Sequence, residues 1–353
     1  MSLAVALLGA NGYGGAELIR RLRRHPAVGE MRLGSRSYEG RAAAEAWPQL
    51  AGLELGSFVT PDRALEDVDV AFLATPHGAT APWVRAARAA GARVVDLSAD
   101  SRLDAETYAR WYGEHPHPAD LDDAVYGLVE AHRDELPGAE LIAAPGCNAT
   151  AVSLALLPFA SAGLLGDDTP VCTVLAGVSG AGRATAPGLH YAELEGTVRP
   201  YKVAGGHRHL AEIEVTLGRA ERQGRALRTR GPGAPRPVSF TPHLVPMVRG
   251  ILASCTFRPA GDADERTLLA AMSDAYRDDP LVHVQKALPE TKAVAGSDRA
   301  LLGVRLDART GLATAFAAID NLGKGAAGQA VQAFNVAFGY PEAEALEMEG
   351  RWP

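Results

Sequence analysis

The stretch Gly9-Ala10-Asn11-Gly12-Tyr13-Gly14-Gly15 follows an apolar run over residues 3–8 and precedes a helical pattern over residues 16–24. Glycines in such a turn let the chain reverse tightly and bring backbone N–H groups close to a pyrophosphate at the start of a helix. The spacing is GxxGxxG rather than GxGxxG, and a glycine-rich turn can also have a purely structural role. Its place after the first expected strand favours a dinucleotide-binding loop.

Apolar runs of strand length alternate with helical patterns through the first 150 residues. This alternation is typical of a parallel sheet wound by helices. The run Val70-Ala71-Phe72-Leu73 is apolar throughout, as expected for a strand buried on both faces. We therefore expect an α/β domain with a Rossmann-type doubly wound parallel sheet, helices at 16–24 and 82–90, and strands at 3–8, 31–34, 68–75, 94–98 and 141–144.

The pattern changes after Cys147, where expected strands follow one another with fewer helices between them. A helix over 265–276 carries apolar residues at helical spacing. Residues 228–237, rich in Arg, Gly and Pro, indicate a loop, and a last helix over 326–338 could pack on either domain. The second half therefore predicts an α+β domain with a mixed or antiparallel sheet, built from strands at 171–178, 238–240, 250–257, 301–306 and 312–319.

The composition sets limits on the class of protein. The 353 residues, 47% of them apolar, suffice for two domains with a large core. Charged residues make up 22%, and no apolar run approaches the roughly 20 residues of a membrane helix, which predicts a soluble protein. The net charge of −7 argues against a nucleic acid bound through bulk charge. Three widely spaced cysteines indicate reduced thiols in the cytoplasm, and residues 1–8 resemble a strand more than a signal peptide.

Ser35-Arg36-Ser37 lies where a dinucleotide-binding domain carries the residue that recognises the ribose. In NAD-binding proteins this residue is usually acidic. A guanidinium between two hydroxyls instead suits a 2′-phosphate, because Arg pairs with phosphate and a carboxylate would repel it. The sequence therefore favours NADP over NAD, unless Arg36 is simply a surface residue.

Cys147 lies in Pro145-Gly146-Cys147-Asn148-Ala149-Thr150, between an apolar strand and an apolar helix. At the N-terminus of a helix, the dipole and the exposed N–H groups favour thiolate over thiol. Cys172 and Cys255 lie inside strand patterns, where a cysteine is more often a small buried apolar side chain, and Cys147 could have the same inert role. A thiolate beside a nicotinamide instead indicates hydride exchange with a thiohemiacetal or thioester on the sulfur.

His207 and His209, in Gly205-Gly206-His207-Arg208-His209, are candidates for general acid/base catalysis. They would share one face of a strand or lie on different faces at the start of a helix. Metal binding is a poor interpretation, because no cysteine or carboxylate lies nearby at ligand spacing. A structural role for either histidine remains the alternative.

Eight stretches carry a wider likeness: residues 9–15, 74–78, 96–102, 145–150, 177–183, 207–213, 242–247 and 321–326. Together they resemble the N-acetyl-γ-glutamyl-phosphate reductases, in the group that includes aspartate-semialdehyde dehydrogenase. The resemblance implies an NADPH-dependent reductase of two domains. Residues 1–146 would bind NADP, with a helix at 323–340 packing back on them, and residues 147–322 would form the catalytic and dimerisation domain.

The family resemblance also implies roles for single residues. In such enzymes the cysteine attacks an acyl phosphate, phosphate leaves, and hydride converts the thioester to a semialdehyde. Cys147 takes the first role and His207, ahead of His209, the proton transfers, while Asn321 would lie near the nicotinamide. The implied substrate residues are Arg102, Asn148 and His209. The dinucleotide would contact Gly9, Asn11, Gly12, Tyr13, Gly14, Gly15, Ser35, Arg36 and Ser37.

The nucleophile motif departs from the family pattern. Reductases of arginine biosynthesis usually have Gly-Cys-Tyr-Pro-Thr where this chain has Gly146-Cys147-Asn148-Ala149-Thr150. That variant is similar to the paralogue in lysine biosynthesis by the aminoadipate route, where the small acidic carrier protein LysW blocks the amine. We therefore expect [LysW]-aminoadipate 6-phosphate as substrate, with N-acetyl-γ-glutamyl phosphate as the alternative. Both substrates need a blocked amine, because a free amine would cyclise onto the activated carboxylate. The two differ by one methylene, which a binding pocket can discriminate by only about 1–3 kcal/mol.

Further features bear on partners and on other functions. A basic run could steer an acidic carrier or could be a solvated surface, and an exposed sheet predicts a homodimer or homotetramer. A non-catalytic NADP-binding sensor would have an unreactive thiol, and a hydroxy-acid dehydrogenase would leave the placement of Cys147 unexplained. The basic run consists of Arg219, Arg222, Arg225, Arg228, Arg230 and Arg236.

Overall fold

The computed structural model describes residues 2–223 and 235–352, which form two compact units. The first unit comprises Met1–Pro145 and Ala326–Leu346, and the second comprises Gly146–Gly325 and Glu347–Pro353. Of the loop expected at 228–237, residues 228–234 lie outside the described residues, and residues 235–237 have no regular structure. The first unit is therefore discontinuous in sequence.

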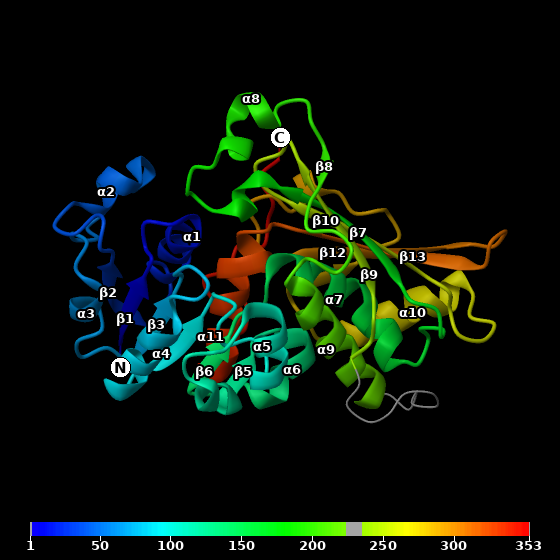
Figure 1. The fold of residues 1–353 in the computed structure, drawn as a ribbon, viewed down its shortest axis with the longest axis horizontal. Helices are drawn as coiled ribbons and strands as arrows, with labels where there is room; N and C mark the ends of the chain where they lie inside the picture. Colours follow the sequence, from blue (N-terminus) through cyan, green and yellow to red (C-terminus); the bar gives the residue numbers. More distant parts are fainter. Residues whose placement is uncertain (1, 224–234, 353) are drawn as a thin grey trace. The chain divides into compact units, whose positions relative to one another are not determined.

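A six-stranded parallel sheet forms the centre of the first unit, in the order β2-β1-β3-β4-β6-β5 (Figure 1). This confirms the predicted parallel α/β domain. The strand β5 was not predicted; unlike β6, whose residues are all buried, it is only half-buried along its length. The strands are β1 (Leu3–Leu8), β2 (Val28–Gly34), β3 (Val70–Leu73), β4 (Arg93–Asp96), β5 (Ala124–Tyr126) and β6 (Leu141–Ala143).

Helices cover both faces of this sheet. Neighbouring residues of β3 point to opposite faces: Phe72 packs in one apolar core with Leu18 and Phe334, and Ala71 packs in the other with Val84. The sheet is therefore doubly wound. The helices of the first unit are α1 (Tyr13–Leu22), α2 (Ala43–Ala46), α3 (Pro61–Ala64), α4 (Ala81–Ala89), α5 (Ala105–Tyr112), α6 (Val129–His132) and α11 (Gly328–Phe338).

Two helix starts differ from the prediction. Helix α1 begins at Tyr13 rather than at residue 16, so Gly14 and Gly15 lie in its first turn. A Cβ on Gly15 would come 2.5 Å from the Cα of Ala10. Close packing of the helix against Ala10 therefore requires glycine at this position, and not the conformation of a turn. The last helix begins at Gly328, and the preceding residues Gly323–Ala327 form a π-helical turn.

A seven-stranded mixed sheet forms the second unit, in the order β11-β12-β13-β10-β7-β9-β8. The pairs β7–β9 and β11–β12 are parallel and the others are antiparallel, which confirms the expected mixed sheet. Strand β9 runs past Phe240, where the prediction ended because a proline follows. The strands are β7 (Val171–Gly177), β8 (Arg199–Pro200), β9 (Ser239–Val245), β10 (Ile251–Phe257), β11 (Val282–Val284), β12 (Ala300–Asp307) and β13 (Leu312–Ile319).

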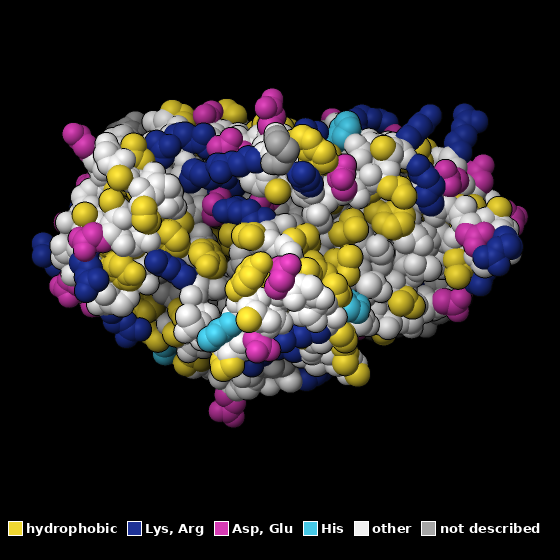
Figure 2. Space-filling model, turned by 90° about the horizontal axis from the view of Figure 1, so that it is seen from above, with side chains coloured by type: hydrophobic (Ala, Val, Ile, Leu, Met, Phe, Trp, Pro, Cys, Tyr) yellow, Lys and Arg dark blue, Asp and Glu magenta, His cyan; other side chains and the backbone are white. Residues whose placement is uncertain are grey.

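The two faces of this sheet differ in burial. In β10, Ile251, Ala253, Cys255 and Phe257 are buried, whereas the alternate residues are only half-buried. The longer helices lie along the buried face (Figure 1). Seen from the other side, hydrophobic and uncharged side chains gather over the sheet, with charges mainly at its margin (Figure 2). The helices of this unit are α7 (Cys147–Ser161), α8 (Tyr191–Leu194), α9 (His209–Gln223) and α10 (Glu265–Ala275).

Candidate active site

The glycine-rich loop lies at the carboxyl ends of β1 and β3, where the strand order of the first sheet reverses. Such a switch point is where ligands bind in open α/β sheets. Gly9 has φ +79°, and a Cβ on it would come 2.4 Å from the carbonyl oxygen of Ala74. Gly12 is the N-cap of α1, with no side-chain capping hydrogen bond. The two backbones therefore meet so closely that only glycine fits, and the start of α1 presents N–H groups to a ligand.

Side chains from separate loops meet beside this turn. The amide nitrogen of Asn11 donates to Ser37 Oγ at 3.4 Å, and Ser37 Oγ lies 3.5 Å from Ser35 Oγ. The indole N–H of Trp47 donates to the carbonyl oxygen of Ala10 at 2.9 Å, and its ring centroid lies 6.1 Å from that of Tyr13. The structure therefore brings Ser35-Arg36-Ser37, at the end of β2, next to the glycine-rich loop, and Trp47 supports the loop from outside the predicted motif.

Cys147 is the first residue of α7, and Gly146 is its N-cap. The backbone N–H of Gly146 donates to Glu212 Oε2 at 2.8 Å, which fastens the start of α7 to α9. A Cβ on Gly325, in the π-helical turn, would come 2.9 Å from the Cβ of Cys147. The partly exposed thiol of Cys147 therefore lies between the start of a helix and a bare stretch of backbone.

The other two cysteines form a buried pair. Cys172 in β7 and Cys255 in β10 lie directly opposite each other, and both are fully buried. A hydrogen bond with Cys172, and then burial, raise the pKa of the Cys255 thiol well above its usual range. Such thiols lack the features of a reactive nucleophile.

The two histidines lie at the start of α9. His209 is the first residue of this helix, and its ring centroid lies 4.7 Å from that of His207. A Cβ on Gly146 would come 2.5 Å from His209 Nε2, so the ring of His209 packs directly over the backbone beside Cys147. Of the two predicted arrangements, the structure has the helix start, with the rings in contact.

His207 is the more enclosed of the pair. Its side chain is 8% exposed, and its ring contacts those of Tyr201 and Phe240. His207 Nδ1 accepts a hydrogen bond from the backbone N–H of His209 at 3.1 Å. Burial, and then the charge of Lys202, lower the pKa of His207 to about 4, so this histidine is neutral at pH 7.

Tyr201 also belongs to the cluster of His207 and His209, although the sequence did not indicate it. The amide nitrogen of Asn148 donates to the Tyr201 hydroxyl at 3.4 Å. Burial raises the pKa of Tyr201, the hydrogen bond from Asn148 lowers it, and the charge of Cys147 raises it. The one feature of the sequence that could have indicated Tyr201 is its position six residues before His207. Only the folded loop brings its hydroxyl to Asn148 at the start of α7.

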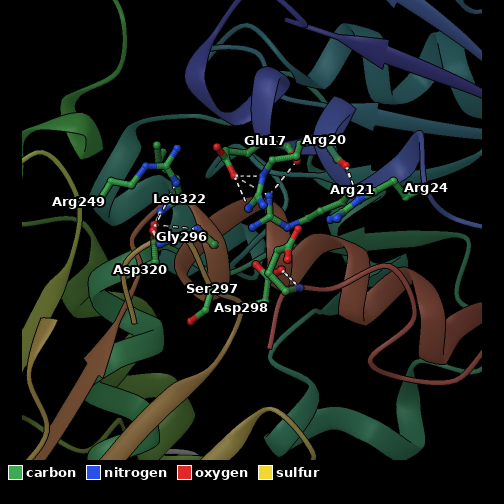
Figure 3. A network of polar contacts seen from close by, with 12 residues as sticks. Glu17, Arg20, Arg21, Arg24, Arg249, Gly296, Ser297, Asp298, Asp320 and Leu322 are labelled. Carbon is green, nitrogen blue, oxygen red and sulfur yellow. Dashed lines mark hydrogen bonds and ion pairs between the residues drawn. The ribbon is translucent and has the colours of Figure 1, made fainter. Parts of the chain in front are cut away.

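Asn321 connects three loops of the second unit. Its side-chain oxygen accepts from the Gly250 N–H at 2.9 Å, and its amide nitrogen donates to Ser179 Oγ at 2.9 Å. The neighbouring Asp320 is fully buried and accepts backbone N–H groups of Leu322 at 2.7 Å, of Gly323 at 3.0 Å and of Gly296 (Figure 3). Arg249 pairs with this carboxylate at 3.3 Å. These contacts shape the turn that carries Gly325 to Cys147.

Arg102, an expected substrate residue, belongs to the first unit and binds backbone there. Its Nε donates to the carbonyl oxygen of Ala144 and its Nη2 to that of Leu97, both at 2.8 Å. Nearby, the buried Asp100 accepts N–H groups from the loop after β3. Burial raises the pKa of Asp96, which accepts hydrogen bonds from Ser98 and Ser101. The carboxyl ends of β3, β4 and β6 are therefore fixed by side chains of residues 96–102, one of the eight stretches that carry the family resemblance.

The prediction of a basic surface formed by six arginines was wrong for Arg236. Arg236 is 4% exposed, donates to the carbonyl oxygens of Gly166 and Asp168, and pairs with Glu221 at 3.1 Å. It is therefore a structural residue and not part of a docking surface, because its guanidinium is buried and bonded within the second unit. Arg219 and Arg222 lie half-buried on α9. Three members lie outside the described residues: Arg225, Arg228 and Arg230.

Two family models match most of the chain. Residues 4–139 match the semialdehyde dehydrogenase NAD-binding domain, and residues 147–321 match the semialdehyde dehydrogenase dimerisation domain. The chain belongs to the semialdehyde dehydrogenase family. This member is therefore an oxidoreductase, and its nucleotide-binding domain lies in residues 4–139.

Individual relatives extend over the full length of this family member. A Thermus thermophilus protein named N-acetyl-gamma-glutamyl-phosphate reductase is 48% identical, covering 99% of this chain and 100% of its own. A Natronomonas pharaonis protein, named putative [LysW]-L-2-aminoadipate/[LysW]-L-glutamate phosphate reductase, is 40% identical, covering 99% of this chain and 97% of its own. Aspartate semialdehyde dehydrogenase from Candida albicans, solved with NADP, shares the fold with a TM-score of 0.66 at 18% identity, covering 95% and 98% of the two chains.

Among residues 2–223 and 235–352, no helix of this enzyme combines the length and the apolar character that crossing a bilayer demands.

Proposed function

We propose that this enzyme uses NADPH to reduce the acyl phosphate of an amine-blocked amino acid to its semialdehyde, with release of phosphate. The observation that carries the proposal is the position of Cys147 at the start of α7, with His209 packed over the adjacent Gly146. The helix dipole and the first-turn N–H groups favour the thiolate. A carboxylate is too poor an electrophile for hydride, whereas an acyl phosphate passes readily to a thiol.

The reaction balances with the groups at this site. The thiolate of Cys147 attacks the acyl carbon, the S–C bond forms, and the C–O bond to phosphate breaks. Bound NADPH supplies the hydride that reduces the thioester carbon. The hydride leaves an oxyanion on that carbon, which takes a proton from the enzyme to form a thiohemiacetal. The thiohemiacetal returns this proton as the S–C bond breaks, which releases the aldehyde and restores the thiolate. The enzyme must therefore supply and take back one proton and hold the sulfur in a fixed position.

The histidines are proposed to handle this proton. The sequence analysis favoured His207, whereas the contact of His209 with Gly146 favours His209 as the group that exchanges the proton. His207 accepts the backbone N–H of His209 and thereby fixes the start of α9, with its own proton on Nε2. His209→Gln would then lower kcat more than His207→Gln.

The cofactor site is proposed on the residues of the first unit. Gly9, Gly12, Gly14 and Gly15 leave room for the pyrophosphate at the start of α1, beside Asn11 and Tyr13. Ser35, Arg36 and Ser37 suit the 2′-phosphate of NADP, and the Candida albicans protein of the same fold is solved with NADP. Asn321 is proposed to act as a positioning residue, because its amide already joins the loops of Ser179 and Gly250. Arg102 stays a predicted substrate residue.

N-acetyl-γ-glutamyl phosphate is the proposed substrate, supported by the name of the Thermus thermophilus relative. The aminoadipyl phosphate carried by LysW is the second candidate. It is favoured by Asn148 and Ala149 after the nucleophile and by the name of the Natronomonas pharaonis relative. A comparison of kcat/KM for the two acyl phosphates with NADPH separates them, and turnover of neither contradicts the proposed function.

Substitution of the nucleophile tests the mechanism. Cys147→Ser should reduce turnover by at least about 10³-fold, because a neutral hydroxyl is a far weaker nucleophile than a thiolate, while NADPH binding measured by fluorescence stays unchanged. Cys255→Ala is the matched control, since that thiol is buried in β10. Substantial turnover by Cys147→Ser would overturn the thioester mechanism.

A second copy of this chain is the proposed partner of the half-buried face of the mixed sheet. Val171 at the edge of this face is 50% exposed, and uncharged side chains cover its centre (Figure 2). An exposed face of this kind favours self-association. The name of the family module at residues 147–321 supports the same proposal.

A further inference from the structure

Asn148 follows the nucleophile directly and occupies the second position of α7. Its side chain is 1% exposed. The amide nitrogen donates to the Tyr201 hydroxyl at 3.4 Å, but among the described residues its Oδ1 has no hydrogen-bond partner. Burying an acceptor without a partner costs about 1–3 kcal/mol. Native structures rarely tolerate this cost unless a ligand or a water molecule supplies the donor.

Tyr201 holds the amide of Asn148 in this orientation. Burial raises the pKa of the Tyr201 phenol, which therefore stays neutral at physiological pH and can accept the Asn148 N–H. The charge of Cys147 also raises this pKa, which indicates that the phenol lies close to the sulfur. Because the nitrogen of Asn148 is engaged, the oxygen is the end of the amide that still lacks a donor among the described residues.

The chemistry of the proposed substrate indicates what that ligand group is. An acyl phosphate with a blocked amine carries acceptors at its phosphate, acyl, carboxylate and amide oxygens. The N–H of the blocking amide is the donor in this set. Only a few bonds separate that nitrogen from the carbon that Cys147 attacks, so a side chain adjacent to the nucleophile is within reach of it.

We propose that Asn148 Oδ1 accepts a hydrogen bond from the amide N–H of the blocked amine and so acts as a specificity-determining residue. This inference rests on the proposed function. It explains why a polar side chain occupies a buried position directly after the nucleophile. It also gives the amide group a second purpose: besides preventing cyclisation, the amide supplies the contact that holds the acyl carbon at the sulfur.

The test removes the donor and the acceptor separately. In the reverse direction, with NADP⁺ and inorganic phosphate, wild-type enzyme is given N-acetylglutamate semialdehyde or the analogue in which an acetoxy group replaces the acetamido group. The wild type should show about tenfold lower kcat/KM for the ester, because Asn148 Oδ1 then stays unpaired. Asn148→Leu, of similar volume, should use both compounds with equal kcat/KM, and Asn148→Asp, which keeps an acceptor, should retain a preference for the amide.

Each outcome has a defined meaning. Equal use of amide and ester by the wild type, or an unchanged preference in Asn148→Leu, overturns the role of Asn148. Failure of the wild type to use either N-acetylglutamate semialdehyde or the carrier-linked aminoadipate semialdehyde contradicts the proposed function instead. Ser153→Ala is the matched control in the same helix, since the hydroxyl of Ser153 is buried and also lacks a partner among the described residues. If Asn148→Leu does not fold, the amide-to-ester ratios of the wild type and Asn148→Asp decide.

Discussion

His207 shows how enclosure changes the chemistry of a single side chain. Ring contacts with Tyr201, His209 and Phe240 remove it from water, and an imidazolium there would be poorly solvated. Its pKa of about 4 means that the native protein holds this group neutral where an unfolded chain would protonate it. The same enclosure suits a residue that must keep one tautomer and one orientation.

The stability of the protein should depend on pH through this residue. The pKa of His207 is about 4 in the fold and about 6.5 when unfolded, so between these values only the unfolded chain binds the proton. The stabilisation is fully present above pH 6.5 and declines as the pH falls toward 4, by about 3 kcal/mol in total. Urea unfolding of the wild type and of His207→Asn, which keeps an acceptor near the His209 N–H, should show a shallower decline for the variant.

The exposed His283 provides the control for this measurement, since a side chain in water contributes little to stability. His283→Asn should follow the wild-type curve. Parallel curves for the wild type and His207→Asn between pH 6.5 and 4 would contradict the neutral, enclosed state of His207.

The sequence indicated some residues of this site and not others, for a physical reason. Cys147 could be found because helix capping and the dipole act locally, so a cysteine in a Pro-Gly turn before an apolar helix is visible as a pattern. Tyr201 reaches Asn148 across 53 positions of the chain, and such a contact follows from tertiary packing. Arg236 was placed wrongly for the same reason, because its partners Gly166 and Asp168 lie 70 and 68 positions away in the sequence.

At the scale of elements, the π-helical turn Gly323–Ala327 determines the position of the nucleophile. The Gly325 N–H donates to the Asp320 carbonyl oxygen at 2.9 Å, which is the wider hydrogen bond of a π-helix. The buried Asp320 side chain also caps Leu322 and Gly323. The wider turn places Gly325, which has no side chain, against Cys147. In a regular helix a side chain would lie at this place.

Gly325→Ala should therefore impair chemistry more than folding. The added Cβ would lie 2.9 Å from that of Cys147, closer than real side chains approach, so the sulfur must shift. A misplacement of about 1 Å can lower kcat by about a hundredfold, so a smaller shift should still lower kcat, and labelling of Cys147 by iodoacetamide should slow while NADPH binding persists. Gly180→Ala is the control, because its Cβ would meet Asn321 Nδ2 at an ordinary 3.6 Å. Unchanged kcat and labelling in Gly325→Ala would refute the positioning role of the turn.

Strand bounds and helix ends were both predicted unevenly, since β9 extends past its predicted end and α1 begins before its predicted start. Strands β1 and β13 have the predicted bounds because continuous apolar or alternating runs mark both ends. The start of α1 was placed late because glycine is a poor helix former, and the contact of Gly15 with Ala10 outweighs this preference. The π-helical turn before α11 was read as ordinary helix, since its hydrogen bonds depend on Asp320 rather than on a local pattern.

At the scale of the whole molecule, the mixed sheet offers one face for association. Ser254, paired with Phe316 on one side and Thr173 on the other, lies half-buried at the centre of this face. Its side chain points away from α7, so a substitution here leaves the core of the second unit untouched. The assembly can therefore be tested apart from the fold.

For the proposed homodimer, Ser254→Glu should yield a monomer, because a carboxylate at the centre of an interface loses its hydration without gaining a partner. Light scattering after size exclusion gives the mass, and circular dichroism should remain that of the wild type. Ala270→Glu adds the same charge on the exposed side of α10 and should leave the mass unchanged. A Ser254→Glu protein with the wild-type mass would place the interface elsewhere.

Helix α11 also determines when the first unit can fold during synthesis. Its Phe334 packs against Phe72 and His25 in the same apolar core, yet it is made after the whole body of the second unit. At about 5–20 residues per second, the ribosome needs roughly 10–40 s to pass from β6 to the end of α11. During that interval one face of the parallel sheet lacks part of its cover, so the first unit can complete its core only after the second unit has been synthesised.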